Sequence, residues 1–189
     1  MRLTDTPASL QTLAYILSSA LVSLFVQVIV FAIMAGYFAA VDHLHIPADR
    51  LLKMGCFFVL GAMTATLLNA LIVQFIHSST TFSRLSAIIG AAAGFAVATY
   101  MPYGGLTSHA QSLVKLVPNS YEAIALRDLF LQGQLPSNGK SELLSYLGAQ
   151  IKIHGYLLSR RDCLYLLLGV TIILTIIVIT VATVTDRNR

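Results

Sequence analysis

Four long stretches of the chain contain no Asp, Glu, Lys or Arg, and they cover residues 6–41, 54–83, 85–114 and 163–185. A helix needs about 20 apolar residues to cross the hydrocarbon core of a bilayer. Within that core each backbone polar group must be paired inside the protein, and a helix does this within its own segment. The pattern therefore predicts an all-α fold, a polytopic helical membrane protein.

The composition agrees with this prediction. Charged residues make up 11% of the chain, which is less than half of the roughly 25% usual in soluble domains. The net charge of +4 comes from residues that mostly lie between the apolar stretches, and it suits loops beside anionic lipid headgroups. No basic run or stripe is present. Membrane lipid, and not nucleic acid, is therefore the expected partner.

We expect one domain, residues 1–189, with about four transmembrane helices and several short interfacial or extracellular helices. The predicted spans are residues 16–38, 54–76, 85–101 and 163–183. The third is expected to end before Pro102 and the glycines that follow it, because proline and glycine disfavour a helix interior. Residues 106–161 are predicted to be an extramembrane region with helices at about 108–117, 120–131 and 141–158.

Four spans place both termini on the same side of the membrane. If that side is the cytoplasm, most Lys and Arg residues fall outside, many of them within residues 106–161. The positive-inside rule would then favour the opposite orientation, but it gives little weight to loops that approach ~60 residues. Charge alone therefore leaves the orientation open.

Small and amide side chains are the notable features inside the predicted spans. Gly90 and Gly94 form a G-x-x-x-G pattern, which lets a second helix approach closely, either within the chain or across a dimer. Gln27, Asn69 and Gln74 either fasten helices to one another or line a substrate path. No predicted span has a charged residue near its middle, which argues against a proton relay.

Motifs for cofactor-dependent or hydrolytic chemistry are not found. Residues 133–141 resemble a phosphate-binding loop, but five residues separate the glycines where that loop needs four. The loop at residues 42–49 contains Asp42, His43 and His45, and we interpret it as solvated. The chain has no G-x-S-x-G and no H-E-x-x-H sequence. We therefore expect no metal, no cofactor and no ATP binding by this chain itself.

The order of several short elements resembles that of type-2 ABC exporter permeases. Thr6-Pro7-Ala8-Ser9 precedes the first span, a Ser/Thr-rich turn occupies residues 78–83, and the third span ends in an aromatic-proline break, Tyr100-Met101-Pro102. The most specific element is Leu116-Val-Pro118-Asn-Ser-Tyr121-Glu-Ala-Ile-Ala125-Leu126-Arg127, which resembles the family's NP-x-x-Y and ALR segment. Val117 stands where the family usually has asparagine.

The resemblance implies a permease subunit whose termini are cytoplasmic and which is not itself an enzyme. Such permeases have six spans, so the chain is expected to begin in the loop after the second. The segment with Thr4, Asp5, Thr6, Pro7 and Ser9 would dock on a separate ATP-binding subunit. The element with Pro118, Tyr121, Ala125, Leu126 and Arg127 would gate the exit. A second copy or a different permease chain would complete the transporter in the cell membrane.

Two other classes of function stay open at this stage. One is a membrane-embedded hydrolase that uses Ser108, His109 or His154. The other is a membrane assembly or immunity protein that transports nothing. The substrate of an exporter is not indicated by any residue of the sequence.

Overall fold

The computed structural model describes residues 8–43, 46–76, 78–135, 139–153 and 155–187, and over these ranges the fold is all-α, as the sequence predicts. Its three longest helices are α1 (Ala8–Val41), α2 (Ala48–Gln74) and α7 (Arg160–Arg187). The shorter helices are α3 (Ser79–Ala96), α4 (Ser108–Leu116), α5 (Pro118–Leu131) and α6 (Lys140–Tyr146). A 3-10 turn, η1 (Tyr103–Gly105), precedes α4, and two short antiparallel strands, β1 (Lys152–Ile153) and β2 (Tyr156–Leu157), precede α7.

Among the described residues, α1, α2 and α7 are the helices long and apolar enough to cross a membrane. Large apolar side chains such as Phe25, Ile33 and Ile176 are exposed on them. An apolar surface spread over whole helices far exceeds the patches of a few hundred Å² found on soluble monomers. The structure therefore supports a membrane-embedded protein with lipid around these helices.

The predicted span at residues 85–101 is not confirmed. α3 ends at Ala96, its first two turns are rich in Ser and Thr, and Arg84 lies in its second turn. The helix ends with Ala98 in a left-handed conformation, with φ 55°. The Thr99 N–H donates to the carbonyl of Gly94 at 2.8 Å, and the Ala98 N–H donates to that of Phe95 at 3.1 Å. This pair of bonds is a Schellman termination, usually made with glycine.

The predicted helix at residues 141–158 is also shorter than expected. α6 ends at Tyr146, and Gly148, with φ 70°, takes the left-handed position after it. The Ala149 N–H donates to the carbonyl of Leu144 at 2.9 Å, as in the termination of α3. The chain then forms the β1–β2 hairpin, which turns at Gly155 with φ 84°.

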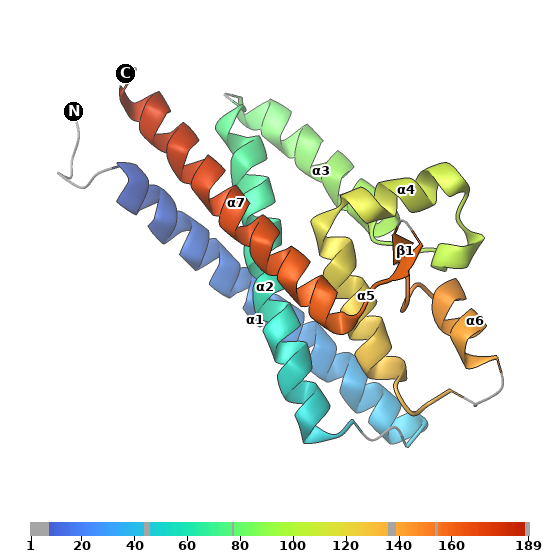
Figure 1. The fold of residues 1–189 in the computed structure, drawn as a ribbon. Helices are drawn as coiled ribbons and strands as arrows, with labels where there is room; N and C mark the ends of the chain where they lie inside the picture. Colours follow the sequence, from blue (N-terminus) through green and yellow to red (C-terminus); the bar gives the residue numbers. More distant parts are fainter. Residues whose placement is uncertain (1–7, 44–45, 77, 136–138, 154, 188–189) are drawn as a thin grey trace.

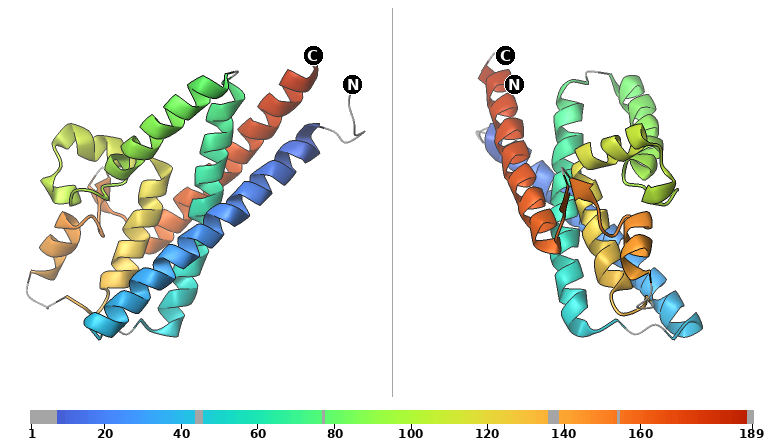
Figure 2. Two further views of the ribbon diagram at one scale, coloured as in Figure 1. Left: turned by 180° about the vertical axis from the view of Figure 1, so that it is seen from behind. Right: turned by 45° about the vertical axis from the view of Figure 1, so that its right-hand side comes forward.

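α2 lies at the centre of the helix bundle. It packs against α1, α5 and α7, while α3 packs on α4, and α4 on α5 (Figures 1 and 2). The beginning of α1, the end of α7 and the turn between α2 and α3 all lie at the same end of the bundle (Figure 1). The structure thus folds α5, part of the predicted extramembrane region, against two candidate spans.

The apolar core follows from this arrangement. Its larger cluster joins α2, α5 and α7 through fully buried side chains that include Met54, Leu129 and Leu167. A smaller cluster joins the far end of α2 to α1 and α7 through Ile16, Leu67 and Val178. Between the two clusters, at the middle of α2, the packing turns polar, and this region forms the candidate site.

Candidate functional site

Glu122 of α5 is the centre of the candidate site. Its side chain is 6% exposed, and it is the one charged residue in the buried class within the described ranges. Its neighbours on the same helix, Ser120, Ile124 and Ala125, are buried as well. A carboxyl group buried among membrane helices costs free energy unless it is paired or neutral, and is therefore a functional-site hypothesis by default.

Two amide side chains donate hydrogen bonds to this carboxyl group. Gln27 Nε2 of α1 donates to Glu122 Oε1 at 2.6 Å. Asn119 Nδ2, one turn earlier on α5, lies 3.4 Å from Glu122 Oε2 and donates to the backbone carbonyl of Gly61 at 3.1 Å. The three side chains and the Gly61 backbone therefore connect α1, α2 and α5 at one point.

Gly61 provides the space that the carboxyl group occupies. A Cβ atom added at Gly61 would overlap both oxygens and the carboxyl carbon of Glu122. Gly61 is at the midpoint of α2, and Gln27 is close to the midpoint of α1. The carboxyl group therefore meets both helices near their midpoints.

Glu122 lies on α5, which is not one of the candidate spans. Burial has the largest effect on the pKa of its side chain. Desolvation raises the pKa of Glu122 from 4.5 to about 7, although the hydrogen bonds from Gln27 and Asn119 act to lower that pKa. The charged form loses its hydration shell, and two neutral amides replace only part of it. Both protonation states are therefore accessible near neutral pH.

Gln27 has an atom suited to the neutral form of the carboxyl group. Its Oε1 is buried and has no hydrogen-bond partner among the described residues. The amide offers both donors and an acceptor, and its two orientations are interchangeable by a half turn. The same side chain can therefore donate to an ionised Glu122 or accept from a protonated one.

Two cavities lie along α1 and α2 near the contact between Gln27 and Glu122, and Gln27 lines the first of them. A cavity of about 480 Å³ between α1, α2 and α5 is lined mostly by apolar side chains, with Gln27 and Arg127 as its polar members. A second cavity of about 570 Å³ follows α1 and α2 toward the end where α1 begins. Its polar lining comprises Thr12, Ser19, Ser23, Thr66, Asn69 and Gln74.

The predicted gate element forms α5 and is held on the end of α3. The Arg127 guanidinium Nη2 donates to the carbonyls of Val97 at 3.0 Å and Ala98 at 2.6 Å. Ser120 Oγ donates to the carbonyl of Ala96 at 3.1 Å. These bonds satisfy carbonyls that have no partner within α3 after it stops. Burial lowers the pKa of Arg127 below its usual range.

The other predicted gate residues have structural roles in α5. Pro118 starts the helix, where a proline is favoured because its missing N–H would be unpaired anyway. The Tyr121 hydroxyl donates to the carbonyl of Lys115 at 2.6 Å, which ties α5 to α4. Ala125 is fully buried in the core, and Leu126 packs against it.

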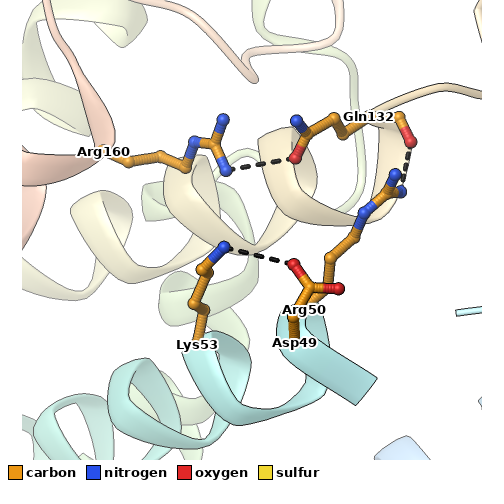
Figure 3. A network of polar contacts seen from close by, with 5 residues as sticks. All are labelled: Asp49, Arg50, Lys53, Gln132 and Arg160. Carbon is orange, nitrogen blue, oxygen red and sulfur yellow. Dashed lines mark hydrogen bonds and ion pairs between the residues drawn. The ribbon is translucent and has the colours of Figure 1, made fainter. Parts of the chain in front are cut away.

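A polar network holds the other end of α5 (Figure 3). Arg50 donates to the backbone carbonyl of Gln132, the residue that caps α5. Arg160 Nη1 donates to Gln132 Oε1 at 3.1 Å, and Arg160 also pairs with Asp128 at 2.6 Å. Cations at a helix C-terminus interact favourably with the helix dipole. α5 is therefore fixed to α2 and α7 at one end and to α3 at the other.

Two of the three predicted pathway amides, Asn69 and Gln74, lie away from Glu122. Gln74 Nε2 donates to the carbonyl of Val178 at 3.3 Å and so fastens α2 to α7. Asn69 donates to Ala65 of its own helix at 3.0 Å and remains exposed in the second cavity. Thr64 and Thr171, which the sequence did not single out, place their hydroxyls 2.8 Å apart between α2 and α7.

The remaining predicted residues are not brought to this site. No side chain of the described residues lies within 4 Å of a Cβ placed at Gly90, whereas one placed at Gly94 would meet the ring of Tyr100. Ser108 and His109 are exposed on α4. Thr4, Asp5, Thr6, Pro7 and His154 lie outside the described residues, and Ser9 falls in the first turn of α1. Within the described ranges, no group of three His, Cys, Asp or Glu side chains could hold a metal ion.

The sequence alone did not single out Glu122, because this residue lies outside the apolar stretches in which a buried charge was expected to be informative. α5 is a short helix outside them, and its packing brings the carboxyl group to the middle of α1 and α2. A signal was present nonetheless. An amide at the middle of one span, Gln27, and a glycine at the middle of the next, Gly61, indicate a polar group inserted between them.

Family models, curated proteins and solved structures were each compared with this chain, and none matches it. Its function must therefore be argued from the site and from the sequence elements described above.

Proposed function

We propose that this chain is the membrane-spanning permease subunit of an ABC exporter in the cytoplasmic membrane. It would move a substrate with energy from ATP hydrolysed by a separate subunit, and its termini would be cytoplasmic. The observation that carries the proposal is the placement of α5. The segment from Pro118 to Arg127, which resembles the family's gate element, packs inside the bundle against α2 and α7.

In this proposal, movement caused by the ATPase reaches the gate through the contact between α1 and α5. α1 begins next to the segment expected to dock on the ATP-binding subunit. At its middle, α1 touches α5 through the hydrogen bond from Gln27 to Glu122. A tilt of α1 would break this bond and enlarge the cavity of about 480 Å³ between α1, α2 and α5. The docking end and the gate would then move together.

A second permease copy or a different permease chain is part of the proposal. The candidate seam is the part of α3 around Gly90, which meets no side chain of the described part of this chain, whereas Tyr100 of the same chain covers Gly94. Small residues four apart permit close helix approach in a membrane. No comparable observation supports the membrane-embedded hydrolase, because two of its candidate residues, Ser108 and His109, are exposed on α4.

The test is co-expression with an ABC ATPase whose gene is a neighbour of the gene for this chain. We expect the two proteins to co-purify and the chain to raise the ATPase rate. Replacing Asp5, Thr6 and Pro7 together with alanine should abolish both effects, whereas Lys140→Ala, in the exposed first turn of α6, should leave both unchanged. Equal binding and equal stimulation by both variants would contradict the docking role. Absence of any bound ATPase would contradict the exporter and leave the assembly protein as the better proposal.

A further inference from the structure

We propose that Glu122 is a reversible proton-binding site at the centre of the helix bundle, which exchanges its proton through the groove between α1 and α2. The reaction is the association of one proton with the carboxylate to give the carboxylic acid, with water in the groove as donor and acceptor. The proposal does not depend on an ATPase partner, because it rests on the contacts of Glu122 within this chain.

The neighbours of Glu122 suit a proton better than a metal cation. A hard cation needs about six oxygen ligands, or a shell of water in their place. Around Glu122 the polar atoms are mainly amide N–H donors, from Gln27 and Asn119, and the nearby Gly61 carbonyl already accepts from Asn119. The partner that a protonated carboxyl group needs is an acceptor, and the buried, unpartnered Gln27 Oε1 provides one.

No formal charge on the packed helices faces the carboxyl group. The described part of α1 has no charged residue before Asp42. The charges of α2 lie in its first two turns, those of α7 lie in its first and last turns, and Lys53 is eight residues from Gly61, about 12 Å along the helix. On α5 itself, Arg127 turns to the end of α3, and Asp128 pairs with Arg160. The charged residues of these helix ends are Asp49, Arg50, Lys53, Arg160, Arg161, Asp162, Asp186 and Arg187.

The groove between α1 and α2 leads from one end of the bundle toward this carboxyl group. On α1 its lining residues Thr12, Ser19 and Ser23 continue the face that carries Gln27, since Gln27 is one turn beyond Ser23. On α2, Gly61 is likewise one turn from Ala65, which lines the same groove. The groove therefore ends one helical turn from Gln27 and Gly61, the residues that contact Glu122, and its hydroxyl groups can hold the water that carries a proton.

Ionisation of Glu122 would change the contact between α1 and α5. Hydration would stabilise a carboxylate in this position, and the cavity of about 480 Å³ beside Gln27 has room for water. The protonated state would favour the dry, closed bundle, and the ionised state would favour admission of water between α1 and α5. Proton binding thus gives the site a means of controlling access to that cavity.

Infrared spectroscopy of the full chain in phosphatidylcholine and phosphatidylglycerol vesicles tests the proposal. A protonated carboxylic acid in a dry environment has its own carbonyl stretch, which shifts when the proton is exchanged for deuterium. We expect such a band below pH 7 and its loss above pH 7. It should be absent in Glu122→Gln and present in Glu142→Gln, a matched change in the exposed first turn of α6.

The route is tested by the rate of deuterium exchange of the same band. Ser23→Leu fills the groove and should slow the exchange several-fold. Ser18→Leu makes the same change on an exposed face of α1 that does not line the groove, and should leave the rate unchanged. If Glu122→Gln does not fold, carbodiimide labelling of the unaltered chain, mapped by mass spectrometry, replaces it. Labelling of Glu122 should rise as the pH falls through 7.

Each outcome tests a different part of the proposal: the proton site, the route or the identity of the ligand. A band that persists in Glu122→Gln, or the absence of any titrating band in the unaltered chain, overturns the proton site. Equal exchange rates in Ser23→Leu and Ser18→Leu overturn the groove as the route. A band shift that follows sodium concentration at constant pH overturns the proton as the ligand. A positive result together with no ATPase partner would leave this inference standing and the exporter rejected.

Discussion

Replacing Gly61 with alanine tests the close contact between α2 and the buried carboxyl group of Glu122. In an ordinary helix interior this change stabilises by up to about 1 kcal/mol, because alanine has the better helix propensity. Here the new methyl group would occupy the space of the carboxyl group. Overpacking costs about 1–3 kcal/mol, and a lost hydrogen bond from Gln27 or Asn119 costs about 1–3 kcal/mol more. We expect a net destabilisation of about 2 kcal/mol.

A double-mutant cycle isolates this contact. With Glu122→Ala the methyl group of Gly61→Ala meets no carboxyl group, so the same change should be neutral or stabilising. The coupling free energy between the two positions should then be about 2–3 kcal/mol, within the range of residues in direct contact. The assay is reversible unfolding in mixed detergent micelles, followed by circular dichroism for the four proteins of the cycle.

Gly55→Ala is the matched control, since it makes the same change on the same helix. A Cβ atom at Gly55 meets nothing within 4 Å in the described structure. That variant should be as stable as the unaltered chain, or more stable. If Gly61→Ala behaves like Gly55→Ala, or has the same effect with and without Glu122, the packing described here is wrong.

Three further predictions concern the same region. Because burial raises the pKa of Glu122 from 4.5 to about 7, the folded state binds more protons between these values than the unfolded state does. The free energy of unfolding should therefore fall by about 3 kcal/mol as pH rises across that interval and stay level above it, and Glu122→Gln should abolish this slope in thermal melts at several pH values. Arg127→Ala leaves the carbonyls at the end of α3 unpaired and should destabilise by about 2 kcal/mol, with faster proteolysis after α3; normal stability and unchanged proteolysis would contradict the capping role. Thr64→Val and Thr171→Val should each cost about 1 kcal/mol, and the double variant should cost no more than either single one, so additive losses in a detergent unfolding series would argue against a shared contact.

The sequence predicts the long helices well because their determinant is local. Twenty or more apolar residues without a charge favour a membrane helix wherever they occur, and α1, α2 and α7 follow this rule. The helix at residues 120–131 was also predicted close to its observed bounds, since Pro118 and Gly133 delimit it. In each case neighbouring residues in the chain determine the structure.

The end of α3 depends on distant residues and could not be predicted in this way. Ala96, Val97 and Ala98 are all compatible with a continuing helix, and the chain turns there because Ser120 and Arg127 of α5 bond their carbonyls. The position of Glu122 has a similar origin. Its depth in the bundle follows from the packing of α5 on α2, which no local pattern of α5 reveals.

The way in which α3 stops has a consequence for any molecule that passes beside α5. Three consecutive carbonyl oxygens, those of Ala96, Val97 and Ala98, accept from side chains of a different helix. Hydrogen bonds inside one helix break only when that helix unwinds, but these three break when α5 merely shifts. A displaced α5 would leave a row of unoccupied acceptors next to a freed guanidinium group. Water or a polar cargo could then bind where protein had been bound to protein.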